Sequence, residues 1–225
     1  MTKLQALVEK RKSSFVYLKK THEGGCYWLN CVQLNRKPDL EAYAAEIPRA
    51  RTTQLFYLGL SLARLLQSGC GGAAVVRGAL QLFEEWEYHF AGNAAQSVRG
   101  LMAKVNTQTQ GQGVEGGGSA SGGGEDNNPV VARLCKFGSE MVYEHLLTPP
   151  LPFALDYFEV FFSLCDIICQ VYNKLMEEEC YSNVHVFEAL VKVDAKVKRH
   201  VLNVTAKEFT EMSAKIARSE LAALR

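Results

Sequence analysis

The residues best suited to chemistry in this 225-residue chain are its seven cysteines. Cys165 and Cys169 stand four positions apart, and on a helix that spacing lets two thiolates share a metal ion. A zinc site needs two further ligands, and no His or Cys stands nearby at a recognisable spacing. Cys26 and Cys31 also lack a CxxC partner. We therefore interpret the thiols as reduced core or half-buried side chains, and we expect no metal and no cofactor.

The histidines fit no catalytic motif. The chain's five histidines are His22, His89, His145, His185 and His200. None lies in an HExxH motif or in a context that suggests a triad. His89 follows Glu84, Glu85 and Glu87, which we interpret as the solvated face of a helix rather than a metal site. Catalytic groups can meet in the fold from distant positions, so an enzyme stays a minor alternative, and we expect a non-enzymatic protein.

Cations concentrate on the first predicted helix. Against Glu9 alone, this helix carries Lys3, Lys10, Arg11, Lys12, Lys19 and Lys20. Such a set can contact nucleic acid, an acidic membrane surface or a cytoskeletal filament such as a microtubule. The same cations can simply keep the helix soluble. We favour this interpretation, because the net charge of +1 gives no argument for a polyanionic partner. Polyanion binding through these six residues is the alternative function.

Tyr27 and Trp28 are the aromatic candidates for partner binding. They lie in a short apolar segment beside Gly24 and Gly25. At the surface they would be good anchors for a protein partner. The other interpretation, which we slightly favour, is that they plug the end of a helical bundle.

The stretch 153–176 predicts the element against which the other helices pack. Its apolar residues form two adjacent helical seams, and its polar residues form a third. Two adjacent seams suit a helix that is covered by two or more neighbours. Asp156, Glu159 and Asp166 interrupt the stretch, so we do not expect it to span a membrane.

Apolar spacing and breaker residues predict most of the remaining elements. Helices are expected over 2–21, 39–47, 54–68, 73–90, 94–105 and 129–147. The last of these would have Asn128 as its cap and Pro129 at its first position. Residues 26–34 are ambiguous. They favour a helix, while a hairpin pairing 15–20 with 26–31 is the alternative.

The final helix begins at Ser182 or Asn183 and is expected to run to the C-terminus. Its apolar seam runs through Leu190, Val193, Val197, Val201, Val204, Phe209, Met212 and Ile216. The seam slips by one residue between Val204 and Phe209. A helix of over 40 residues usually projects from a fold or pairs with a partner along part of its length.

Glycine-rich residues 107–128 separate two helical halves, 1–106 and 129–225. Their composition predicts a flexible linker. The linker either joins two subdomains or expands a surface loop of one domain. We favour the second, because each half looks too apolar to stand alone. The predicted fold class is all-α, an irregular bundle of about seven to eight helices with a long C-terminal helix and a disordered Gly-rich linker.

These observations predict a non-enzymatic helical adaptor or scaffold subunit that binds a protein partner. We expect the contact residues to be Val197, Val201, Val204, Phe209, Met212 and Ile216, with Tyr27 and Trp28. The odd cysteine count and the lack of a signal sequence or membrane span indicate a cytoplasmic protein, with the cytoskeleton as one location.

Overall fold

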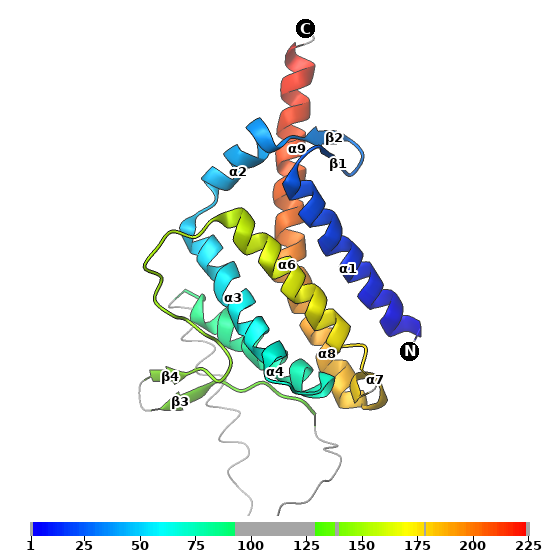
Figure 1. Cartoon of the computed structure of the whole chain (residues 1–225), viewed down its shortest axis with the longest axis vertical. Helices are drawn as coiled ribbons and strands as arrows, with labels where there is room; N and C mark the ends of the chain where they lie inside the picture. The colour runs from blue at the N-terminus through cyan, green and yellow to red at the C-terminus, as the bar shows by residue number, and fades with distance from the viewer. Residues whose placement is uncertain (1, 93–128, 138–139, 178, 224–225) are drawn as a thin grey trace, which may run out of the picture.

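The structure is a computed structural model, and it describes residues 2–92, 129–137, 140–177 and 179–223 (Figure 1). These residues form an all-α bundle with two small β-hairpins, so the predicted fold class is confirmed. The helices are α1 (Thr2–Glu23), α2 (Glu41–Glu46), α3 (Arg49–Gln67), α4 (Gly72–His89), α6 (Tyr157–Lys174), α7 (Glu179–Ser182), α8 (Val184–Val197) and α9 (Asn203–Ala223). The strands are β1 (Cys26–Trp28), β2 (Val32–Leu34), β3 (Cys135–Phe137) and β4 (Glu140–Val142).

Helix α6 lies at the centre of the bundle, between α1 and α3 (Figure 1). It begins at an N-cap, Asp156, whose side chain accepts the Glu159 N–H. Phe161, Leu164 and Ile168 are at most 1% exposed. Phe158, Cys165 and Tyr172, from the second seam, are also buried, and α6 contacts both α1 and α3, so the helix is covered by two neighbours as the sequence predicts.

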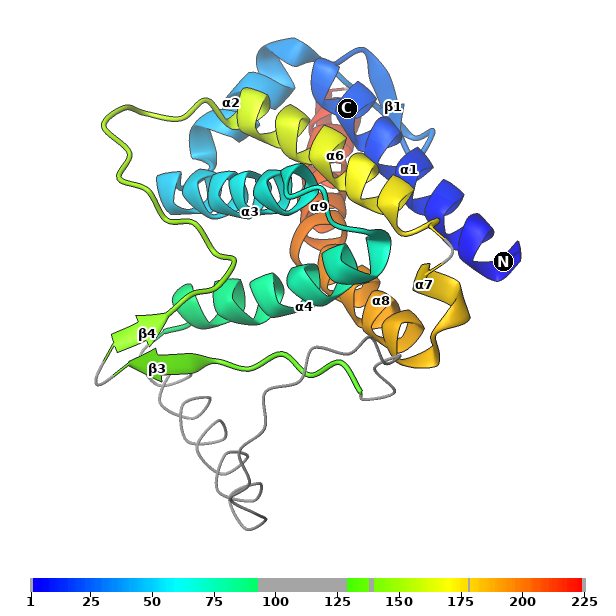
Figure 2. The same cartoon turned by 60° about the horizontal axis from the view of Figure 1, so that its bottom comes forward.

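Helices α4 and α8 pack together on the far side of α3 and α6 (Figure 2). Asn183 caps α8 by accepting two backbone N–H groups. The chain continues from α8 into α9 through a wide turn, Lys198–Leu202, where the Asn203 N–H donates to the Lys198 carbonyl five residues earlier. This turn lies just before the position where the apolar seam slips by one residue. The last turns of α9 project beyond the bundle (Figure 1).

Residues 26–34 form a hairpin within themselves, and not the expected helix or the alternative hairpin that pairs 15–20 with 26–31. Strands β1 and β2 pair with each other, with Trp28 opposite Val32. Both strands alternate, so that Trp28 and Leu34 face the core while Tyr27 and Gln33 face outward. Residues 15–20, the other partner considered, belong to α1.

The helix expected over 129–147 is also wrong, because this segment is extended and contains the hairpin β3–β4. Side chains of α4 form hydrogen bonds with the backbone of this extended segment, in place of the bonds that a helix would make within itself. Glu85 is 1% exposed and accepts the backbone N–H groups of residues 144, 145 and 146 at 2.8–3.0 Å. Gln81 binds both the N–H and the carbonyl of Arg133. The extended path then continues to the start of α6, as Pro149, Pro150 and Pro152 predict.

Helices from both sides of the glycine-rich segment pack against each other, α3 with α6 and α4 with α8. Their buried apolar side chains belong to one core cluster. The predicted linker 107–128 and the predicted helix 94–105 lie outside the described residues.

Candidate functional site

The predicted partner seam lies largely inside the chain's own core. Val197, Val201 and Phe209 are 3%, 0% and 0% exposed. The remaining seam residues are half-buried: Val204, Met212 and Ile216. The first three side chains have no area to offer a partner, which corrects the interpretation of the seam as an exposed contact face. Its apolar period reflects packing within the chain.

The hairpin β1–β2 separates the two aromatic candidates. Tyr27 is 54% exposed, whereas Trp28 is 5% exposed. Trp28 packs edge-on against Phe209, with ring centroids 5.2 Å apart, and donates its Nε1–H to Thr210 Oγ1 at 3.2 Å. Trp28 therefore plugs the end of the bundle, and Tyr27 faces outward.

Exposed apolar and aromatic side chains gather on α1 and the hairpin. We call the hairpin surface the three residues Tyr17, Tyr27 and Leu29. The Tyr17 hydroxyl joins the two elements, because it accepts the Leu29 N–H at 2.9 Å and donates to the Tyr27 carbonyl at 3.0 Å. The Tyr17 ring also stacks on Trp28, with centroids 5.5 Å apart. The surface is thus held in place from the core.

Leu29 occupies a strained position at the tip of the hairpin. Its φ is 48° and that of Asn30 is 59°, in the left-handed region that leucine rarely adopts. The turn is closed by the Cys31 N–H, which donates to the Trp28 carbonyl at 2.9 Å. Leu29 is 60% exposed in this turn. Backbone strain concentrates at functional sites, so the tip is the part of this surface best suited to contact a partner.

Two of the six cations on α1 are engaged within the chain. Arg11 forms two hydrogen bonds with Asp194, at 2.6 and 2.9 Å, and Lys19 binds Asp166 at 2.7 Å. Of the other four, Lys12 is half-buried, and three are exposed: Lys3, Lys10 and Lys20. Polyanion binding has fewer available cations than predicted, and it stays a prediction.

Arg11 belongs to a buried network that joins α1, α6 and α8. The Tyr172 hydroxyl donates to Asp194 Oδ1 at 2.7 Å. Burial alone would raise the pKa of Asp194, but the hydrogen bonds from Arg11 and Tyr172, with the positive charge of Arg11, outweigh it and lower that pKa. The pKa of Tyr172 is raised by burial and by the Asp194 carboxylate. This carboxylate therefore stays ionised, and Arg11 is a structural residue.

A second buried polar network lies behind the hairpin surface. His22 is 0% exposed, and its Nδ1–H donates to the Leu18 carbonyl at 2.7 Å. Its Nε2 can then accept from the Tyr157 hydroxyl at 3.2 Å. The Tyr43 hydroxyl lies 3.3 Å from that of Tyr157 and donates to Glu208 Oε2 at 2.7 Å. Burial lowers the pKa of His22 to about 4, so the ring is neutral at pH 7.

These four groups come from α1, α2, α6 and α9, which explains why no local motif marks them. An imidazole, two phenols and a carboxylate could transfer protons, but His22 is closed off by ring contacts with Phe161 at 4.0 Å and Phe209 at 4.6 Å. Burial also raises the pKa of Tyr157. The arrangement stabilises the meeting point of the four helices beneath Trp28.

The glutamates of α4 are structural, which corrects their interpretation as a solvated face. Glu85 binds backbone N–H groups, as described above, and Glu84 and Glu87 bind Lys196 at 2.8 and 2.9 Å. His200, from the wide turn before α9, also binds Glu87 at 2.6 Å. These contacts join α4 to the α8–α9 helix.

Within the described ranges, no group of three or more His, Cys, Asp or Glu side chains could hold a metal ion. Cys165 is buried and Cys169 half-buried. Burial raises the pKa of both thiols, which keeps them protonated and poorly suited to bind a metal.

Comparison with models of known protein families, with curated proteins and with solved structures finds no match. Among the helices that the structure describes, none combines the length and the apolar character needed to cross a bilayer. The candidate site therefore depends on this chain's own geometry, and the hairpin surface is its best-defined exposed feature.

Proposed function

We propose that the chain is a non-enzymatic protein-binding subunit, an adaptor or scaffold, that contacts its partner through the hairpin surface. The observation that carries the proposal is the exposure of Tyr27 and Leu29 on a hairpin that Trp28 and Tyr17 hold rigidly. Rigid aromatic and aliphatic anchors contribute most to protein interfaces, because little conformational entropy is lost when they bind.

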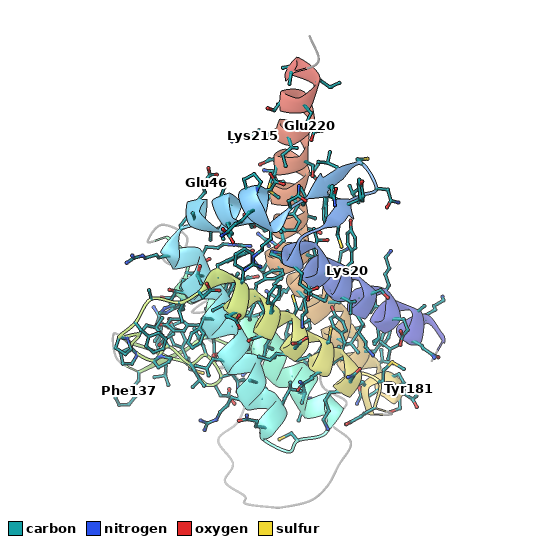
Figure 3. The ribbon with its side chains drawn as sticks, turned by 45° about the horizontal axis from the view of Figure 1, so that its top comes forward. Lys20, Glu46, Phe137, Tyr181, Lys215 and Glu220 are labelled. Carbon is teal, nitrogen blue, oxygen red and sulfur yellow. The ribbon has the colours of Figure 1, made fainter. Side chains whose placement is uncertain are left out.

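The charges around the hairpin surface indicate the character of the partner. Lys20 is exposed one helical turn after Val16 and Tyr17, and Lys12 precedes them by one turn. The exposed turns of α9 that carry Lys215 and Glu220 extend past the hairpin (Figure 3). An apolar patch with acidic groups at its edge would complement this surface, and the lysines would affect association rate more than affinity.

A cytoplasmic location is part of the same proposal. All seven cysteines are free thiols, and Cys31, Cys70 and Cys135 are exposed. Exposed reduced thiols suit a reducing compartment.

The proposal is tested by placing charge on the hairpin surface of the full-length chain. Tyr27→Asp and Leu29→Asp are combined, and the tagged chain is purified from its own cells under conditions that preserve complexes. A stoichiometric partner should bind the wild type and be lost from the double variant. Circular dichroism should stay unchanged, because both side chains project into solvent.

The matched control places the same two charges on the exposed face of α8. Val184 is 67% exposed and Val191 is 48% exposed. The combination of Val184→Asp with Val191→Asp should retain the partner. Equal retention by both double variants, with their folds intact, would exclude the hairpin surface as the contact.

A further inference from the structure

A groove of about 720 Å³ opens at the N-terminal end of α3. The end of α2, the start of α3 and the start of α6 come together there (Figure 1). One wall is the turn from α2 into α3, and the other is the extended segment that leads to Asp156. The groove is separate from the hairpin surface, and Tyr157 and Phe158, which line it, also contact the buried His22.

The α3 side of the groove is suited to an anion. The N-cap position is Pro48, whose side chain cannot accept a hydrogen bond; its carbonyl accepts the Arg51 N–H at 2.9 Å, and the N–H groups of residues 49 and 50 remain free of any partner in the described ranges. Arg49 lines the groove, and neither Arg49 nor Arg51 has an ion-pair partner among the residues that the structure describes. Free N–H groups, a helix N-terminus and unpaired guanidinium groups all favour negative charge.

Thr52 provides an independent indication of a ligand. It lines the groove and is only 5% exposed. Its hydroxyl makes no hydrogen bond within the part of the chain that the structure describes, and the oxygen is not fully enclosed, so it opens into the groove. A hydroxyl that opens into the groove and has no protein partner is free to donate a hydrogen bond to a ligand oxygen there.

The opposite wall is apolar. Phe153 is 65% exposed, and Leu155 and Phe158 lie beside it along the groove. The volume falls in the range of small-molecule sites, about 300–1,000 Å³. Asp156 also lines the groove and keeps its negative charge close by while it caps α6. A monoanion therefore suits the site better than a dianion.

We propose that this groove binds an amphiphilic carboxylate, with its head group at the first turn of α3 and its apolar body against Phe153 and Leu155. Arg49 and the free backbone N–H groups hold the carboxylate, and the Thr52 hydroxyl donates to it. The proposal does not depend on the partner-binding function.

The probe is 11-(dansylamino)undecanoic acid, titrated into the full chain and followed by dansyl fluorescence. The wild type should bind it saturably, and its methyl ester should bind about ten-fold more weakly, since hydrogen bonds to a charged group contribute at least that factor. Arg49→Gln should weaken binding about ten-fold or more, and Thr52→Val, which keeps the side-chain volume, about five-fold. The control Arg64→Gln, about 22 Å away at the other end of α3, should change binding less than two-fold.

Three outcomes of the probe titration would overturn the proposal. The first is the lack of saturable binding below about 100 μM. The second is equal binding of the acid and its methyl ester. The third is equal affinity of the Arg49→Gln and Arg64→Gln variants. Competition separates the anions: dodecanoate should displace the probe at lower concentration than dodecyl phosphate, and the reverse order would exclude a carboxylate as the preferred head group.

Discussion

Replacement of Arg11 by methionine should destabilise the fold by about 3–5 kcal/mol, because it breaks a buried ion pair from one side. Methionine keeps much of the apolar stem but removes the guanidinium, which leaves the Asp194 carboxylate with Tyr172 alone. The side chains of Arg11 and Asp194 are each 9% exposed. Water therefore cannot replace the two lost hydrogen bonds.

Lys19→Met is the matched control, because it removes a second ion pair between α1 and a neighbouring helix. The side chains of Lys19 and Asp166 are 28% and 59% exposed. Exposed pairs contribute about 0–1 kcal/mol, so this variant should lose little stability. Each substitution replaces a cation on α1 by methionine and leaves a carboxylate without its partner, and the two pairs differ mainly in burial.

Urea unfolding at pH 7, followed by circular dichroism, measures the difference. With a slope of about 2–3 kcal/mol per molar urea, the midpoint should fall by about 1–2.5 M for Arg11→Met and by less than about 0.5 M for Lys19→Met. Adding Asp194→Leu to Arg11→Met should restore most of the loss, because apolar side chains can replace a buried pair. Equal midpoints for the two single variants would refute the reasoning and return Arg11 to the candidates for polyanion contact.

Three further predictions concern other buried groups. Val201→Asp should destabilise the chain by about 3 kcal/mol or more, whereas Val191→Asp should change stability by about 0.5 kcal/mol at most; thermal unfolding compares them. His22 contributes stability that is complete above pH 6.5 and is lost by about 3 kcal/mol as the pH falls to about 4, since its folded pKa is lowered. Denaturant unfolding across this range should show that loss in the wild type and not in His22→Gln, and an equal loss in both would contradict it. Glu85→Gln should cost about 2 kcal/mol or more, because an amide cannot accept all the N–H groups of residues 144–146. Limited proteolysis should then cut 129–147 faster than in the wild type.

The helices α1, α3, α4 and α6 could be predicted because their apolar spacing is a local property of the sequence. Leu4, Val8, Phe15 and Leu18 recur at helical spacing, and all four are buried on one side of α1. The same local reasoning placed the start of α8 beside Asn183.

The extended segment 129–147 could not be predicted in this way, because its partners are side chains of another helix. Val130, Leu134, Phe137 and Met141 happen to stand at helical spacing, yet Phe137 is 82% exposed. The hairpin β1–β2 did leave a signal. Asn30 stands between two short alternating runs, the arrangement typical of a tight turn.

The candidate site was only partly accessible from sequence for a similar reason. Arg11 and Lys10 are adjacent cations that look equivalent, but Arg11 meets Asp194, 183 positions away along the chain. Phe209 and Tyr27 both look like apolar anchors, and only the pairing of the hairpin shows that one is buried and the other exposed.

The direction in which Phe209 faces, and with it the support of the hairpin, depends on how many residues follow the wide turn Lys198–Leu202. The wide turn holds one extra residue and leaves the later side chains close to the directions that a regular turn would give them, whereas one residue inserted or deleted in α9 before Phe209 would rotate every later side chain by about 100° about the helix axis. Phe209 would swing away from Trp28, and the hairpin would lose the ring on which it rests. We therefore expect chains that share this exposed tip to preserve the number of residues between the wide turn and Phe209 more strictly than the types of those residues.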